Sequence, residues 1–392
     1  MYGLRSAIIF VLMIVSLGAS TFMLREAATI GPVIGGKKGY AGDYGPVMDA
    51  ILDTPSGLAI ARTGDVYFAD SNNHTIRRFD ARINSEIEPV AGSHDLGSGF
   101  SGDNGPAIVA QLDTPGGVCI APDGDIVVAD SHNDRIRRVD KPTQVITTIA
   151  GSGENGYDGD EKPATEAALA TPSAVACAPN GDIYIADTLN YRVRMIDART
   201  GLIHTIAGDG TAGDRDALHV GDGGPATAAQ LNMPSDVALD RVTGDIYIAD
   251  MHHQRVRKVD AKTHVITTVA GNGQWGNSGD GGSATEARLA GPAGIAVVPE
   301  PNGKVTIFIA DFYNQRVRAV GPDGIIRDIG AEGRAEFGAP TRVAYATSGP
   351  HRGWLYVADS STDRIVPLIL PNIAPNLVPP PRQIAPARRV IG

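Results

Sequence analysis

The hydrophobic and polar positions between Gly181 and Asp197 follow a pattern typical of a β-hairpin. Residues 183–186 form an apolar run rich in strand formers, a four-residue link follows Asp187, and residues 192–197 alternate between polar and apolar side chains. Alternation with a period of two is typical of a strand that buries one face. The segment therefore predicts two antiparallel strands joined by a short link.

The same pattern occurs six times along the chain. The aspartate that ends the apolar run recurs at intervals of 60, 57, 63, 61 and 48 residues, and such a period indicates a repeat architecture. Each unit also has a short strand before the apolar run, as in residues 115–121, and a further strand after the hairpin, as in residues 145–151. Four antiparallel strands in each of six units predict an all-β fold, a six-bladed β-propeller. The six aspartates are Asp70, Asp130, Asp187, Asp250, Asp311 and Asp359.

The sixth unit has no fourth strand of its own, because the chain becomes rich in proline after residue 370. Residues 29–35 resemble the fourth strands of the other units and stand before the first unit. We therefore expect this N-terminal strand to complete blade six. Closing the ring in this way leaves no unpaired sheet edge at the seam.

A long insertion with a Gly-Asp signature separates each unit from the next in most of the chain. It ends in a short Ala-rich segment, as in residues 225–231, which predicts one turn of helix. A carboxylate complements the positive end of a helix, so we expect the insertion aspartates to serve helix starts and turns. Calcium is the alternative, although one carboxylate per blade is few for an ion that takes six to eight oxygens. The aspartates are Asp43, Asp103, Asp160, Asp222 and Asp280.

The composition agrees with a turn-rich β protein. The 392 residues include 48 glycines and 26 prolines, and only 5% are aromatic. The formal net charge is −10, whereas binding to phosphates needs clustered lysine and arginine. We expect no nucleic-acid partner.

The N-terminus is typical of a signal peptide. Arg5 precedes the apolar residues 7–17 and three small residues. If this segment is not cleaved, residues 7–24 are about long enough to anchor the chain in a membrane. We therefore expect an exported protein, periplasmic or extracellular, that meets a membrane only through this segment.

The C-terminal residues 371–392 contain six prolines and three arginines without the repeat pattern. Such a composition predicts an extended, disordered tail. The expected domains are a signal peptide or anchor at residues 1–27, the propeller at residues 28–370 and this tail.

The two cysteines, Cys119 and Cys177, lie on equivalent strands of units two and three. Aligning the units puts them one residue out of register, so they point to opposite faces of their strands. In neighbouring units they could face each other or face apart. Because unpaired cysteine is frequently buried, we expect two buried free thiols.

The units resemble NHL repeats. The resemblance rests on Pro-Ser-Gly-Val-Ala, Asp-Ile-Tyr-Ile-Ala-Asp, Asn-x-Arg-Val-Arg and Ile-Thr-Thr-Val-Ala-Gly-x-Gly, and it covers residues 29–370. The Gly-Asp-Gly-Gly-Pro-Ala insertion is similar to that of exported bacterial NHL proteins and of the teneurin NHL domain. The resemblance implies a six-bladed propeller but no single function, since members include binding modules, sensor domains, RNA-binding domains and a few lyases. Function has to be inferred from the site.

An Asp and an Arg recur five positions apart at the hairpin links. A four-residue link puts them directly opposite each other, as a favourable cross-strand pair. A catalytic group would occur once, whereas these pairs recur in five units, so we interpret them as structural. In unit one Thr75 takes the place of the Arg. The pairs are Asp130 with Arg135, Asp187 with Arg192, Asp250 with Arg255, Asp311 with Arg316, and Asp359 with Arg364.

The hairpin links and the long insertions share one rim, because antiparallel strands alternate in direction. Variable loops on one face are where repeat proteins usually bind. Our candidates on this rim are His132, His252, Tyr191 and Tyr313. The two histidines occupy matching positions and could hold a metal, but solvated surface histidines are the commoner case.

The start of each innermost strand supplies two further candidates. The third position of its Pro-x-x step is Gly or Ala in four units, but Asp236 in unit four and Arg342 in unit six. Both side chains should reach the central channel. We expect a polar constriction or a ligand contact there, with a salt-bridge plug as the alternative.

Two functions agree with these features. The first is a non-catalytic module that binds a protein or envelope ligand on the rim. The second is a metal-dependent enzyme, lactonase- or lyase-like, with several convergent polar residues at the channel mouth. The inner strand starts offer one carboxylate, which favours binding. We predict no catalytic residue and no cofactor, with calcium or a channel metal as the alternative.

Overall fold

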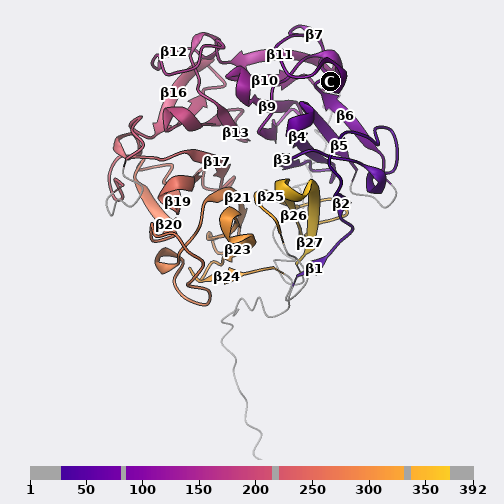
Figure 1. Cartoon of the computed structure of the whole chain (residues 1–392). Helices are drawn as coiled ribbons and strands as arrows, with labels where there is room; N and C mark the ends of the chain where they lie inside the picture. The colour runs from indigo at the N-terminus through magenta and orange to yellow at the C-terminus, as the bar shows by residue number, and fades with distance from the viewer. Residues whose placement is uncertain (1–27, 81–84, 214–219, 331–336, 371–392) are drawn as a thin grey trace, which may run out of the picture.

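The computed structural model describes residues 28–80, 85–213, 220–330 and 337–370. Six antiparallel sheets surround a central axis, each with its first strand innermost (Figure 1). The predicted six-bladed propeller is confirmed. The predictions for residues 1–27 and 371–392 lie outside the described residues. Within the described ranges, no helix has the length and apolar character needed to cross a membrane.

The first three blades run outward from the axis in chain order. Blade one consists of β3 (Pro55–Ile60), β4 (Val66–Asp70), β5 (Thr75–Phe79) and β6 (Ile87–Ala91). Blade two consists of β8 (Gly117–Ile120), β9 (Ile126–Asp130), β10 (Arg135–Val139) and β11 (Val145–Ala150), with the short β7 (Gly105–Pro106) added outside. Blade three consists of β13 (Pro172–Cys177), β14 (Ile183–Asp187), β15 (Arg192–Ile196) and β16 (Leu202–Ala207), with β12 (Lys162–Pro163) outside.

The last three blades follow the same plan. Blade four consists of β17 (Pro234–Leu239), β18 (Ile246–Asp250), β19 (Arg255–Val259) and β20 (Ile266–Ala270). Blade five consists of β21 (Pro292–Pro299), β22 (Val305–Asp311), β23 (Arg316–Val320) and β24 (Ile326–Asp328). Blade six consists of β25 (Pro340–Tyr345), β26 (Trp354–Asp359) and β27 (Arg364–Ile369).

The N-terminal strand closes the ring as predicted. It is divided into β1 (Thr29–Ile30) and β2 (Ile34–Gly35), and both pieces pair antiparallel with β27. Pro32 lies between the two pieces, where the ladder needs no N–H from it. The outer edge of blade six is therefore covered by a segment from the opposite end of the chain.

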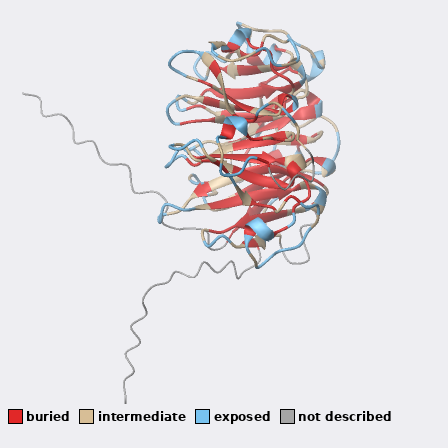
Figure 2. Cartoon of the chain, turned by 90° about the vertical axis from the view of Figure 1, so that its left-hand side faces the viewer, coloured by how far each residue is buried: buried red, intermediate tan, exposed pale blue. Residues whose placement is uncertain are grey.

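The core lies between neighbouring blades. Val127 of blade two and Ile185 of blade three, for example, belong to one buried cluster, and five similar clusters complete the ring. Most strand residues are accordingly buried (Figure 2). The second strands consequently have apolar sequences such as Ile-Tyr-Ile-Ala, because neither face of the blade is open to water there.

The expectation of two free thiols is wrong. Cys119 and Cys177 form a disulfide with 5.8 Å between their Cα atoms. Strands β8 and β13 lie side by side at the axis, so the one-residue offset turns Cys119 toward blade three and Cys177 back toward blade two. The offset that left the pairing open in the sequence is what brings the two sulfur atoms together.

The Asp–Arg pairs are opposite each other in the ladder, but most are not ion pairs. Asp130 is the register partner of Arg135, yet its carboxylate binds Arg137, two residues further along the same face of β10, at 3.1 Å. Arg135 donates to backbone carbonyls and stacks on Phe100. The expected pairing holds as an ion pair only in blade six among the described blades, between Asp359 and Arg364 at 2.9 Å.

The arginine that binds the strand-two aspartate is fully buried and also binds the insertion aspartate. In blade two, Arg137 donates to Asp103 at 2.7 Å as well as to Asp130. The expected helix-start role of the insertion aspartates is therefore wrong: the short 3₁₀ turns follow Pro or Ser without a side-chain cap. The triads are Asp70–Arg77–Asp43, Asp130–Arg137–Asp103, Asp187–Arg194–Asp160, Asp250–Arg257–Asp222 and Asp311–Arg318–Asp280.

Reduction tests the disulfide. We expect reductant to lower the free energy of unfolding by about 2–4 kcal/mol, because the bond restricts the unfolded chain across a separation of 58 residues. Denaturant titrations with and without reductant measure the difference. The Cys119→Ser/Cys177→Ser protein is the control and should not respond to reductant. An unchanged native protein under full reduction would contradict the bond.

Replacing one buried arginine tests the triads. Arg318→Leu should lower the free energy of unfolding by about 3–5 kcal/mol, because it leaves the buried Asp311 without its cation. Arg327→Leu in the same blade removes an exposed ion pair with Asp323 and should cost less than about 1 kcal/mol. Denaturant titration measures the free energy of unfolding of both variants. Equal losses would show that the buried triad stabilises the fold no more than the exposed ion pair does.

The cost of Arg318→Leu should depend on pH. Burial raises the pKa of Asp311 to about 6 in the native protein, although Asn314 and Arg318 oppose the shift. Losing Arg318 raises the pKa of Asp311 further, so above pH 6 the folded variant keeps a proton on Asp311 that the folded native protein releases. The stability of the variant relative to the native protein therefore falls as pH rises. The stability gap should therefore be larger at pH 8 than at pH 5. A constant gap would show that Asp311 does not titrate in this range.

Candidate functional site

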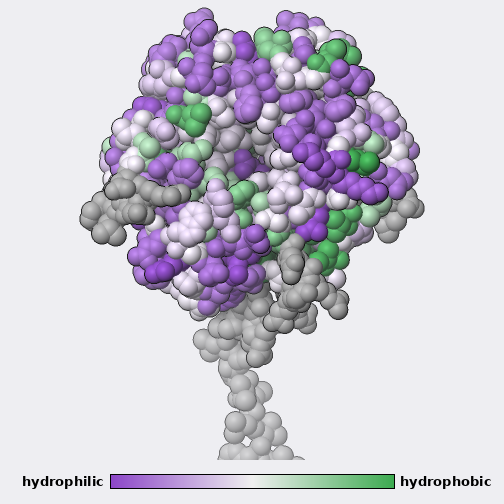
Figure 3. Space-filling view, in the orientation of Figure 1, coloured by the Kyte–Doolittle hydropathy of each residue, from purple (hydrophilic) through white to green (hydrophobic). Residues whose placement is uncertain are grey.

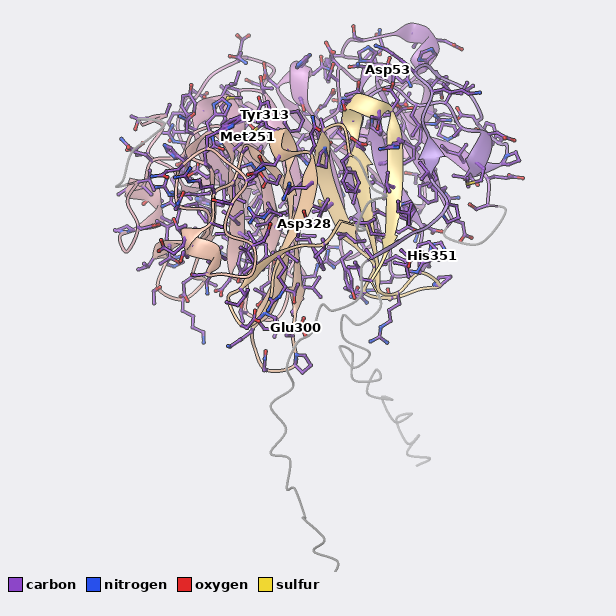
Figure 4. All side chains as sticks on the ribbon, turned by 60° about the horizontal axis from the view of Figure 1, so that its bottom comes forward. Asp53, Met251, Glu300, Tyr313, Asp328 and His351 are labelled. Atoms are coloured by element: carbon purple, nitrogen blue, oxygen red, sulfur yellow. A yellow bond between two sulfur atoms is a disulfide. The ribbon has the colours of Figure 1, made fainter. Side chains whose placement is uncertain are left out.

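The hairpin links and insertions lie on one face of the ring, which we call the rim face. Met251 and Tyr313 lie side by side on this face, whereas Glu300 and His351 lie toward the opposite face (Figure 4). The rim face is hollowed at its centre, around the axis (Figure 3). The hairpin links thus lie on the one face that strand direction predicts.

A hydroxyl group just after the strand-two aspartate joins neighbouring blades on this face. Ser131 donates to the carbonyl of Pro172 in the next blade at 2.7 Å, and Thr188 donates to that of Pro234 at 2.8 Å. Ser71 and Ser360 make the equivalent bonds. Met251 and Phe312 occupy this position in blades four and five, where the link presents an apolar side chain instead.

Four side chains gather where the pattern changes, and we call them the aromatic patch: Met251, Trp275, Phe312 and Tyr313. The Tyr313 ring lies 4.8 Å from that of Trp275 and 4.7 Å, edge-on, from that of Phe312. Tyr313 and Met251 pack over Gly291, where a Cβ atom would be 2.6 Å from the tyrosine ring. Trp275 and Tyr313 are 48% and 50% exposed, so the patch is packed on one side and open to solvent on the other.

The rim histidines occupy separate links. His132 belongs to η5 (Ser131–Asn133) and lies 3.7 Å from Asp113. His252 belongs to η9 (Met251–His253), beside the aromatic patch. Its neighbour His253 is buried against Asp250 at 2.9 Å. Among the described residues, no group of three or more His, Cys, Asp or Glu side chains is arranged to hold a metal.

Tyr191 has a backbone role that the sequence did not suggest. It ends η7 (Thr188–Asn190) in the left-handed conformation, with φ of 56°, and the residues after the other links do the same. Its ring is only partly exposed. Of the rim candidates, Tyr313 belongs to the aromatic patch and His252 adjoins it.

Asp236 and Arg342, the two candidates at the innermost strand starts, lie together at the channel. The Arg342 guanidinium crosses the axis and donates to the carbonyls of Ala293, Ser235 and Ser173, which belong to three other blades, at 2.7–3.0 Å. Its Nε lies 3.8 Å from the Asp236 carboxylate. This geometry is that of a plug at the rim end of the channel.

Asp236 is held by backbone donors as well as by charge. Its carboxylate accepts hydrogen bonds from the N–H groups of Ile295 and Val237 at 2.8 and 2.9 Å. Burial raises its pKa, and Arg342 opposes the shift. Below the plug the channel holds a cavity of about 380 Å³ with mostly apolar walls. Asp236 and Arg342 thus position backbone groups and close the channel.

Trp275 and Met251 were missed by the sequence reading. Trp275 lies in the insertion between blades four and five, at the position that Asn155 and Lys38 occupy in earlier insertions. Met251 replaces a hydroxyl residue at a position that is Ser or Thr in four blades. A position-by-position comparison of the hairpin links would have found Met251, but the insertions differ in length, so Trp275 has no clear signal in the sequence.

Family profiles match several blades. The NHL repeat profile matches residues 52–79, 112–138 and 231–259, and the teneurin NHL domain profile matches residues 141–197. The protein SUPPRESSOR OF QUENCHING 1 of Arabidopsis thaliana is 28% identical over 290 residues, 73% of this chain and 26% of the relative. Human NHL repeat-containing protein 2 is 26% identical over 305 residues, 70% of this chain and 40% of the relative. The chain thus spans less than half of either relative.

The ring also resembles solved structures. An auxiliary nutrient binding protein from Bacteroides ovatus superposes with a TM-score of 0.62 at 16% identity, covering 88% of this chain and 77% of the other. At this identity the likeness concerns the fold alone. The profile matches thus show NHL repeats in blades one, two and four and a teneurin-type NHL segment in blades two and three of this six-bladed ring.

Proposed function

We propose that this propeller is a non-catalytic binding module that takes a protein partner on the aromatic patch of its rim face. The observation that carries the proposal is the pair of half-exposed rings, Trp275 and Tyr313, packed at one place on the rim. Tryptophan, tyrosine and methionine are enriched in the centres of protein interfaces. Rings that are already packed against each other lose little side-chain freedom on binding.

The polar surroundings of the patch agree with this role. His252 lies beside it, and Arg288 packs against Gly276 in the same insertion. Apolar side chains surrounded by polar ones are the usual arrangement of an interface, where the polar rim excludes water from the centre. The partner would thus be recognised by an apolar side chain that packs on the exposed sides of the two rings.

Export is part of the proposal. Its support is the apolar N-terminal sequence after Arg5 and the disulfide between Cys119 and Cys177, since disulfides persist mainly in oxidising compartments. The partner would accordingly be a protein of the envelope or the exterior. A metal-dependent enzyme remains the alternative, and a tightly held stoichiometric zinc or iron in the purified protein would favour it.

The patch should dominate partner binding. We expect Trp275→Ala/Tyr313→Ala to weaken binding of the captured envelope partner by at least about 30-fold, because the loss of even one central aromatic residue costs about 2 kcal/mol or more. The partner is first captured on the native protein, then purified, and its Kd for each variant is measured by titration.

Leu189→Ala is the matched control, since Leu189 is an exposed apolar residue of the blade-three link. It should leave the Kd unchanged. If the patch variant binds the purified partner as tightly as the native protein does, while both remain folded, the proposed interface is wrong.

A further inference from the structure

The face opposite the rim carries a second cavity, of about 840 Å³, beside the axis. It is bounded by the turns that join strands one and two of blades one and two, and by residues near the mouth of the channel. Glu300 and His351 mark this face in Figure 4. The cavity is thus separate from the aromatic patch.

Four cations line this cavity, of which Arg78 is paired with carboxylates. The other three come from three different blades: Arg62, Lys141 and Arg241. Lys141 lies over the blade-two turn, with its Nζ 3.3 Å from where a Cβ of Gly124 would be. Ser348 donates to the Arg62 carbonyl at 3.0 Å, which fixes the blade-one turn. All three residues keep a substantial part of their surface open to solvent.

The carboxylates of the same cavity are already paired with other cations. Glu88 and Asp65 bind Arg78, at 2.6 and 3.8 Å. Asp123 binds Arg138 at 2.5 Å. Within the described ranges no carboxylate lies within ion-pair distance of Arg62, Lys141 or Arg241. Positive charge is therefore left uncompensated in a hollow of a chain whose net charge is −10.

Two of these cations also repel each other. Desolvation by burial lowers the pKa of Arg241, and the charge of Arg62 lowers it further. Both side chains line the same cavity, and a bound anion would lower the free energy of two like charges that share it. The arrangement favours a negatively charged ligand.

The cavity adjoins the channel. Four residues line both the channel and this second cavity: Ile60, Ile120, Cys177 and Arg241. The basic site therefore opens onto the mostly apolar channel wall. The disulfide ties two strands of that wall together, and the Arg342 plug closes the far end. A channel of about 380 Å³ is within the usual size of small-molecule sites.

We infer that this face binds a small amphipathic anion, with its carboxylate held by Arg62, Arg241 and Lys141 and its alkyl chain inserted into the channel. The cations would bind the carboxylate of the ligand, and the apolar channel wall would contact its alkyl chain. The channel is closed by the plug, so its depth limits the length of the chain.

Calorimetric titration of the purified protein with decanoate, acetate and decan-1-ol tests the inference. Decanoate should bind saturably at one per chain, at least about tenfold tighter than acetate or decan-1-ol, because charge-assisted hydrogen bonds and buried CH₂ groups each contribute kcal/mol amounts. If decanoate binds no tighter than acetate, the channel is not used and the inference fails.

Variants separate the two halves of the site. Arg62→Gln/Arg241→Gln should weaken decanoate at least about tenfold and leave decan-1-ol unchanged. Arg199→Gln removes an exposed arginine outside both cavities and is the matched control. Ala296→Phe in the channel wall should weaken decanoate and decan-1-ol but not acetate. Native affinity for decanoate in the double variant would overturn the inference.

The patch variant Trp275→Ala/Tyr313→Ala should keep the native affinity for decanoate. The two sites lie on opposite faces, so the loss of partner binding and the loss of decanoate binding are separate results. A failure of the rim proposal therefore leaves this inference standing, and the reverse also holds.

Discussion

A fully buried arginine between two aspartates holds each of the first five blades to the long insertion beside it. Arg137, for example, bridges Asp130 at the end of a blade strand and Asp103 in the insertion. A buried guanidinium needs both carboxylates and the nearby carbonyls to replace its lost hydration. The insertions are consequently fixed parts of the rim face. Blade six has Val366 at the matching position, and there Asp359 binds Arg364 directly.

Repetition predicted the fold, because every unit repeats the same apolar runs and turns. The same repetition limited what could be predicted of the contacts. Arg135 and Arg137 stand two residues apart on one face of β10, and both can reach Asp130. The sequence pattern identified the register partner, but only the position of the insertion, which supplies Asp103, decides which arginine is buried. A non-local carboxylate of this kind leaves no trace in the periodicity of the strand.

The cysteines and the candidate site show two other limits. Cys119 and Cys177 were placed correctly on opposite faces of equivalent strands, but their meeting depends on how blades two and three pack at the axis. Asp236 and Arg342 were predicted because they break a rule that the other units keep. Trp275 stands in an insertion whose units vary in length, where equivalent positions are hard to align. Residues that depart from a repeat can thus be identified from the sequence in the strands, but not in insertions of varying length.

The Arg342 plug separates the rim face from the opposite face of the ring. Its guanidinium binds carbonyls of three other blades, so opening the channel would break these three hydrogen bonds and leave the buried Asp236 without its cation. A hydrogen bond to a charged group contributes about 1.5–3 kcal/mol, and three would be lost together. The ring therefore favours a closed channel, with the aromatic patch on one face and the unpaired cations on the other. A ligand on either face meets a surface whose shape the plug holds fixed, and small movements at one face do not open a path to the other.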